Sequence, residues 1–201
     1  MSEVMPEQPW MTESEISLLK SSLPPACTAL EFGAGGSTRF FFDNGGYKLT
    51  SVEGDGDWCA RMRADAFLGH FIRKGRLNVF QPDIGPILEG GCSTPQGDAS
   101  ILWINYHAEI WEYIDATSLD FICIDGRFRL SCALQSILHC AHHPIMFMHD
   151  FWNRPEYHAV LQFTDVLGRA DTAVVLRQKS LDSSSWRNLA LCLQKSQFDP
   201  S

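Results

Sequence analysis

The sequence predicts an α/β domain built on a mainly parallel seven-stranded sheet, with helices on both faces and an antiparallel hairpin at the C-terminal edge. Three observations lead to this prediction. Short apolar segments alternate with helical patterns, the first apolar segment opens into a glycine-rich turn, and the last two have no helix between them. Strands that alternate with helices form parallel sheets, whereas strands joined by a short turn pair antiparallel. A chain of 201 residues is expected to be a single domain.

The N-terminal half of the sequence supplies three of the expected strands. It begins with a helical segment at residues 1–25, whose short helix Thr12 or Ser14 can cap and Pro24-Pro25 ends. Gly45-Gly46 ends the helix that follows the first strand. In this half we expect strands at 27–32, 47–52 and 76–81, and helices at 37–44 and 55–69.

The C-terminal half begins with a variable insertion at residues 83–118, where a loop rich in Pro and Gly precedes a helical pattern over 101–116. Strongly apolar segments then predict two more buried strands with a helix between them. A serine-rich turn at 183–185 is expected to join the two strands of the terminal hairpin. In this half we expect strands at 119–124, 144–148, 173–177 and 189–193, and helices at 130–142 and 156–167.

The composition argues against several classes of protein. The formal net charge is -8 and no basic run is present, so no nucleic-acid partner is expected. No apolar stretch approaches the roughly 18 residues of a membrane span, so no membrane association is expected. The N-terminus lacks the pattern of a secretory signal. The seven cysteines are odd in number and contain no C-x-x-C pair, which indicates free thiols in a reducing, cytoplasmic compartment.

The most informative segment runs from Ala29 to Thr38, where an apolar strand ends in Glu31 and breaks into the turn Gly33-Ala34-Gly35. The second expected strand ends in another acid, Glu53. Glycines let a backbone approach a ligand closely. An acid after the next strand can accept the two hydroxyls of a ribose. The segment therefore predicts a nucleotide pocket at the carboxyl ends of the strands.

Two classes of nucleotide fit this pocket. The dinucleotide pattern G-x-G-x-x-G is matched at Gly33 and Gly35, but Thr38 occupies the place of the third glycine. An NAD(P)-dependent oxidoreductase is therefore one alternative. The segment from Glu31 to Ser37 also follows E-x-G-x-G-x-S/T, which resembles motif I of the class I S-adenosylmethionine-dependent methyltransferases. A non-catalytic binding protein of that fold is a third alternative, because such a turn indicates binding and not chemistry.

Two later segments extend the resemblance. The first is Ile124-Asp125-Gly126-Arg127-Phe128-Arg129, and the second is Arg154-Pro155-Glu156-Tyr157-His158. In order after motif I, they resemble a bacterial-type branch of the class I methyltransferases over residues 13–176. The resemblance implies a Rossmann-like fold and S-adenosylmethionine as cofactor, with an acid after the third strand on the adenine amino group. The residues assigned to the cofactor are Glu31, Gly33, Ala34, Gly35, Ser37, Glu53 and Asp83.

Acids after the fourth and fifth strands bear on the reaction. The chain has a more distant resemblance to the catechol- and sugar-type O-methyltransferases, which hold a divalent metal between such acids and a neighbouring Asn or Asp. Asp125 and Asp150 match the two acids, whereas Phe151 stands at the third position and Asn153 lies close by. A magnesium ion is one alternative. The other is a general base such as His149, whose imidazole titrates near neutral pH, although it could equally bond a loop backbone.

The expected reaction is transfer of a methyl group to a small-molecule acceptor, at oxygen. In the alternative to substrate binding, Arg127 and Arg129 form ion pairs with Asp125 that pin the loop, and Arg154 and Tyr157 cap the next helix. No feature of the sequence predicts an oligomeric state. The expected catalytic residues are Asp125, His149 and Asp150, and the expected substrate contacts are Arg127, Arg154, Tyr157 and His158.

Overall fold

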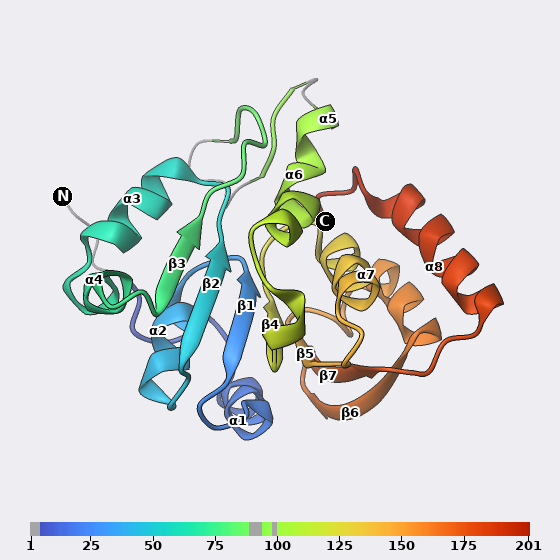
Figure 1. The fold of residues 1–201 in the computed structure, drawn as a ribbon, viewed down its shortest axis with the longest axis horizontal. Helices are drawn as coiled ribbons and strands as arrows, with labels where there is room; N and C mark the ends of the chain where they lie inside the picture. The colour runs from blue at the N-terminus through green and yellow to red at the C-terminus, as the bar shows by residue number, and fades with distance from the viewer. Residues whose placement is uncertain (1–4, 89–93, 98–99) are drawn as a thin grey trace.

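The computed structural model describes residues 5–88, 94–97 and 100–201. In these residues one seven-stranded sheet has the strand order β3-β2-β1-β4-β5-β7-β6 (Figure 1). The first five strands are parallel to one another, and β7 pairs antiparallel with both β5 and β6. The strands are β1 (Thr28–Phe32), β2 (Lys48–Val52), β3 (Leu77–Phe80), β4 (Phe121–Ile124), β5 (Ile145–Met148), β6 (Thr164–Ala170) and β7 (Ala173–Gln178).

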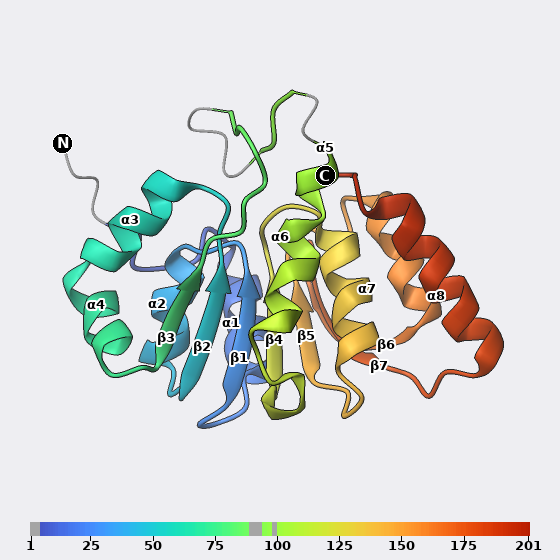
Figure 2. The ribbon, with the colours of Figure 1, turned by 45° about the horizontal axis from the view of Figure 1, so that its top comes forward.

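Helices cover both faces of this sheet, as Figures 1 and 2 show together. On one face, Ala29 and Phe121 pack with apolar residues of α1 (Glu13–Ser22), α2 (Gly36–Asp43), α3 (Gly56–Ala64) and α4 (Ala66–Arg73). On the other face, Leu30 and Ile122 pack under the remaining helices, because side chains alternate along a strand. Those helices include α6 (Asn105–Ala108), η1 (Glu109–Glu112), α7 (Arg129–His139), η3 (Pro155–Gln162) and α8 (Ser183–Ser196).

Most expected elements of the N-terminal half are confirmed. Thr12 caps α1 in a capping box with Glu15, which is a local signal that the sequence carries. The expected helix at 55–69 is instead two helices, α3 and α4, since the Asp65 carboxylate accepts from Leu68 N and starts a new helix. In the insertion, short helices replace one continuous helix. They are α5 (Ser100–Trp103), α6, η1 and η2 (Ala116–Ser118), while residues 89–93 and 98–99 lie outside the described part.

The terminal hairpin is confirmed, and its expected strand at 173–177 is β7, but the other expected strand is wrong. The expected helix at 156–167 is η3 followed by β6, whose residues are mostly exposed and so lack the apolar alternation of a half-buried strand. The expected strand at 189–193 lies inside α8. Asp182 caps that helix, and Leu189 and Leu193, four residues apart, both pack toward the core as helical spacing requires. The hairpin is therefore β6–β7.

Two further expectations can be compared with the described residues. The described cysteines are all free thiols, five of them buried; they are Cys27, Cys59, Cys123, Cys132, Cys140 and Cys192. Cys92 lies outside the described part. Within residues 5–88, 94–97 and 100–201, no helix combines the length and the apolar character that crossing a bilayer requires.

Candidate functional site

A cavity of about 860 Å³ opens at the carboxyl ends of the parallel strands. Its volume lies in the usual range for a small-molecule site. The turn after β1, Glu53 after β2, and the loops after β4 and β5 all contribute to its lining. The cavity brings together ten of the residues expected to carry function, namely Gly33, Ala34, Gly35, Ser37, Glu53, Asp125, Arg127, His149, Asp150 and Arg154.

The glycine turn forms the floor of one end of the cavity. Gly33 has φ +93°, and a Cβ there would come within 2.4 Å of the Gly126 backbone. Gly33 is therefore required for the close packing of the loops after β1 and β4. Gly35 is different, because a Cβ there would meet no atom within 4 Å. Because Gly35 has no side chain, the cavity stays open at this point. The packing of the loops does not require a glycine here.

Glu31 supports this turn from behind. It is 2% exposed and accepts hydrogen bonds from Ser37 Oγ at 2.5 Å, Thr38 Oγ1 at 2.7 Å and Ser51 Oγ at 2.5 Å. Burial raises the pKa of Glu31 to about 7, although the three hydroxyl donors favour its charged form. Glu31 does not line the cavity, so it acts on a ligand only through the turn. Thr38 stands where the dinucleotide pattern has its third glycine, and here its hydroxyl donates a hydrogen bond to Glu31.

Glu53 forms the side wall next to the turn. Its Oε2 accepts from Ala34 N at 3.2 Å and its Oε1 from Asp55 N at 2.9 Å. Trp58 closes the same corner, because its Nε1 donates to Ala34 O at 2.9 Å. The carboxylate is thereby fixed in orientation between the ends of β1 and β2 while it still lines the cavity.

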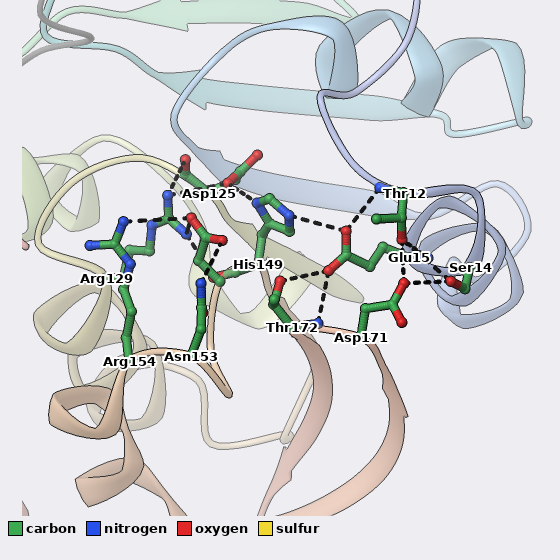
Figure 3. Close-up of polar contacts among 11 residues, drawn as sticks. Thr12, Ser14, Glu15, Asp125, Arg129, His149, Asn153, Arg154, Asp171 and Thr172 are labelled. Carbon is green, nitrogen blue, oxygen red and sulfur yellow. Dashed lines mark hydrogen bonds and ion pairs between the residues drawn. The ribbon is translucent and has the colours of Figure 1, made fainter.

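His149 lies between two carboxylates at the other end of the cavity (Figure 3). Its Nδ1 is 2.9 Å from Asp125 Oδ1, and its Nε2 is 3.3 Å from Glu15 Oε2. Burial alone would lower the pKa of His149, but the hydrogen bond that it donates to Asp125 and the charges of Asp125, Asp150 and Glu15 raise it. A carboxylate at each ring nitrogen fixes the orientation of the His149 ring and favours its charged form.

Glu15 connects the N-terminal helix to this end of the cavity. Its Oε1 accepts from Thr172 N at 3.0 Å and Thr172 Oγ1 at 2.6 Å, and its Oε2 accepts from Thr12 N at 2.9 Å. Burial would raise the pKa of Glu15, but these hydrogen bonds, with the charge of His149, lower it to about 2. The carboxylate therefore joins α1, the turn between β6 and β7, and the end of β5.

Arg129 joins the loops after β4 and β5. Its Nη2 is 3.4 Å from Asp125 Oδ1, and its Nη1 is 3.4 Å from Asp150 Oδ2. Asp150 Oδ2 also forms an ion pair with Arg154 Nη2 at 3.7 Å, and Asp150 Oδ1 accepts a hydrogen bond from Asn153 Nδ2 at 3.3 Å. The two strand-end acids thus share one guanidinium.

The residues proposed for a metal do not fit one as they are arranged. Asp125, Asp150 and Asn153 do lie at this end of the cavity, but the Arg129 guanidinium stands between the two carboxylates. A second cation would be repelled there, and its ligands are already bonded. Among the residues that the structure describes, no group of three or more His, Cys, Asp or Glu side chains is arranged to hold a metal ion.

Besides Glu31 and Asn153, three expected site residues lie outside the cavity lining. Asp83 Oδ1 accepts from Gly85 N at 3.0 Å in a local turn. Tyr157 is 1% exposed and belongs to the core under η3. His158 Nε2 is 3.1 Å from the Phe151 carbonyl oxygen, and its ring packs against the Phe151 ring. Turn and core contacts account for these three side chains.

The segment before α1 forms a wall of the cavity that the sequence analysis did not anticipate. Pro6, Gln8, Pro9 and Trp10 line it, and Trp10 is 97% exposed. This segment crosses directly over the start of α2, since a Cβ on Gly36 would lie 1.8 Å from the Gln8 carbonyl oxygen. The signal for this wall in the sequence is an aromatic residue, Trp10, that follows Pro6 and Pro9.

Tyr106, from α6, is a further lining residue that the sequence analysis did not assign. It is fully buried, and the Arg127 backbone N–H lies 3.4 Å from its hydroxyl oxygen. A Cβ on Gly126 would meet that hydroxyl at 2.1 Å. The glycine of the I-D-G-R-F-R segment therefore makes room for Tyr106 at the base of the cavity.

The comparisons with known proteins define the class of fold. No family model and no curated protein matches the chain. Among solved structures, a methyltransferase-like protein from Silicibacter pomeroyi is similar over 98% of this chain and 100% of its own, with TM-score 0.78 and 23% identity. A candidate methyltransferase from Streptococcus mutans in complex with SAH is similar over 84% and 100%, with TM-score 0.50 and 10% identity. The chain therefore has the class I S-adenosylmethionine-dependent methyltransferase fold.

Proposed function

We propose that this protein is an S-adenosylmethionine-dependent methyltransferase that methylates a small-molecule acceptor at oxygen. One observation carries the proposal. A single continuous cavity has Gly35 and Glu53 at one end and Asp125 and Asp150 at the other. Transfer between two reactants is fastest when both are held in line in one enclosed site. The Streptococcus mutans structure of the same fold contains SAH, which supports the same class of ligand here.

The turn end of the cavity suits the cofactor. Bound there, S-adenosylmethionine would supply an electrophilic methyl group on a positively charged sulfur. Gly35 leaves space for a ligand beside the backbone, and Glu53 presents a fixed carboxylate. Its carboxylate lines the cavity, where it can accept hydrogen bonds from the hydroxyls of a ribose.

The other end of the cavity suits a hydroxyl acceptor. Asp125 and Asp150 are carboxylates that line the cavity, and His149 lies between Asp125 and Glu15. In this proposal, one of the two aspartates accepts the proton that the acceptor hydroxyl loses. His149 and Arg129 orient these acids, so that their role is to position the base.

A small molecule is favoured over a nucleic acid as acceptor. The formal net charge of -8 opposes binding of a phosphate backbone. The segment at Pro6–Trp10 also narrows the cavity on one side. This part of the proposal is tested by including structured RNA among the acceptors.

The test is formation of S-adenosylhomocysteine from S-adenosylmethionine by the wild-type protein with a panel of phenols, alcohols, amines and a transfer RNA transcript. Glu53→Ala should lose cofactor affinity, measured by calorimetry, at least tenfold, the loss of about one charged hydrogen bond. Asp165→Ala, on the exposed strand β6, is the matched control and should bind as wild type. Turnover with a hydroxyl acceptor that Asp125→Asn slows at least a hundredfold supports the proposal.

The other outcomes separate the alternatives. Saturable NADH binding without S-adenosylmethionine binding would move the protein to the oxidoreductases. Cofactor binding without turnover over the whole panel would favour a binding protein of this fold. Turnover with RNA alone would overturn the small-molecule acceptor and leave methyl transfer standing.

A further inference from the structure

The guanidinium of Arg129 is surrounded by oxygen atoms from two loops. Arg129 is the first residue of α7 and is 7% exposed. Its Nε donates to Gly126 O at 2.9 Å, its Nη1 to His149 O at 2.7 Å and its Nη2 to Asp125 O at 3.3 Å. The carboxylates of Asp125 and Asp150 complete the set at 3.4 Å each. Two carboxylates and three carbonyls are a ligand set that hard divalent cations prefer.

The backbone around this cation takes conformations that need support. Phe128 has φ +53° and Asp150 has φ +53°, both in the left-handed region. Phe128 is a bulky residue for which this region is unfavourable. Arg129 bonds to carbonyls on either side of these positions, at Gly126 and His149. One side chain therefore holds both loops in the conformation that presents Asp125 and Asp150 to the cavity.

The charges at this end of the cavity are already balanced. Asp125 is paired with Arg129, and Asp150 is paired with both Arg129 and Arg154. Two carboxylates meet two guanidinium groups, so this pair of acids offers no excess negative charge to a divalent ion. The cation that such a site needs is part of the chain.

We propose that Arg129 is a built-in cation that takes the place of a divalent metal between Asp125 and Asp150. It positions the two acids and makes this end of the cavity independent of added metal. This inference rests on the proposed function for the role of the acids in catalysis. Its test uses metal binding and stability, so the two can fail separately.

The experiment is a Mn²⁺ titration, monitored by electron paramagnetic resonance, of the wild type and five variants. Wild-type protein should have no Mn²⁺ site that depends on Asp150, so Asp150→Asn should bind as much Mn²⁺ as the wild type. The melting temperature of the wild type should not change when EDTA is added. Arg129→Ala should lower the melting temperature by about 10 °C, because it removes the guanidinium that two partly buried carboxylates share and the donors of three backbone carbonyls. It should also gain saturable Mn²⁺ binding, which the double variant with Asp150→Asn loses. Arg187→Ala, at an exposed position of α8, is the control and should behave as wild type.

Two results would overturn the proposal. One is a wild-type Mn²⁺ site that depends on Asp150, and the other is a folded Arg129→Ala variant that neither loses stability nor binds Mn²⁺. If Arg129→Ala is too unstable to fold alone, Mn²⁺ should restore folding; failure to do so also counts against the proposal. In every case Arg129→Lys keeps the charge with fewer donors and should fold without acquiring a Mn²⁺ site. A protein that passes these tests but binds no S-adenosylmethionine would contradict only the proposed function.

Discussion

The two ends of the cavity are held together by different kinds of interaction. At the turn end, Glu31 is buried beneath three hydroxyl donors and contacts no cationic side chain among the described residues, and its pKa is raised to about 7. At the other end, Glu15 and His149 belong to a network of ion pairs, and the pKa of Glu15 is lowered to about 2. Hydroxyl donors at the turn end therefore hold the shape of the loop, whereas ion pairs at the other end hold charged side chains in place. The two ends should therefore respond to acid in opposite directions.

The largest expected effect comes from Gly33→Ala at the turn end. The new Cβ would overlap the Gly126 backbone and sit at φ +93°. We expect the free energy of unfolding, measured in urea, to fall by about 4 kcal/mol or more. Gly45→Ala is the matched control, because φ there is +87° but nothing lies within 4 Å of the new Cβ. It should lose only about 1 to 2 kcal/mol. Equal losses in the two variants would show that close packing of the loops is not the reason for Gly33.

The second effect is the pH dependence contributed by Glu31. Its folded pKa of about 7 lies above the ordinary value of 4.5, so its contribution to stability is fully present below pH 4.5 and lost as pH rises through 7. The loss is about 3 kcal/mol at most. Urea unfolding at several pH values should show this slope in the wild type and in Glu156→Gln, an exposed control, but not in Glu31→Gln. A slope that survives in Glu31→Gln would contradict the assignment.

The third effect is the opposite dependence at Glu15. Its folded pKa of about 2 lies below 4.5, so its contribution is present above pH 4.5 and lost as pH falls through 2. Glu15→Gln should be less stable than wild type by about 1 to 2 kcal/mol near neutral pH, with the difference shrinking in acid. In the Glu15→Gln variant, the imidazole resonances of His149, followed by NMR as the pH is changed, should give a lower pKa than in the wild type. Glu13→Gln, exposed on the same helix, provides the comparison, and an unchanged pKa for His149 would remove Glu15 from the network.

The smallest effect is expected at the wall formed by the segment before α1. Trp10 is 97% exposed, so Trp10→Ala should change the free energy of unfolding by less than about 0.5 kcal/mol. A ligand that Trp10 covers should bind about twofold to tenfold more weakly, since an aromatic contact contributes about 0.5 to 1.5 kcal/mol. Calorimetry with S-adenosylmethionine measures this, and Trp186→Ala on α8 should leave affinity unchanged. Equal affinity in both variants would mean that Trp10 does not cover the cofactor.

The sequence predicted the turn end far better than the other end for a physical reason. Glu31, Ser37 and Thr38 lie within one strand-turn-helix unit, so local patterns reveal their relation. Glu15 and His149 are 134 residues apart, and only the folded chain brings them together. Arg129 stood in a recognised segment, but its contact with the acid after β5 depends on the β4–β5 pairing.

The same distinction applies to the fold. Strands β4 and β5 are continuous apolar runs that are almost wholly buried, and the sequence predicted both. The edge strand β6 has mostly exposed residues and was missed, because its identity depends on pairing with β7.

Gly35→Val tests most directly whether the cavity beside the glycine turn receives the cofactor. A side chain at Gly35 has room in the fold but projects into the space that a ligand needs. The wild type should bind S-adenosylmethionine saturably in a calorimetric titration, whereas Gly35→Val should keep its melting temperature and lose binding. A wild type that binds nothing at millimolar ligand, or a folded Gly35→Val that binds as well as wild type, would contradict the claim.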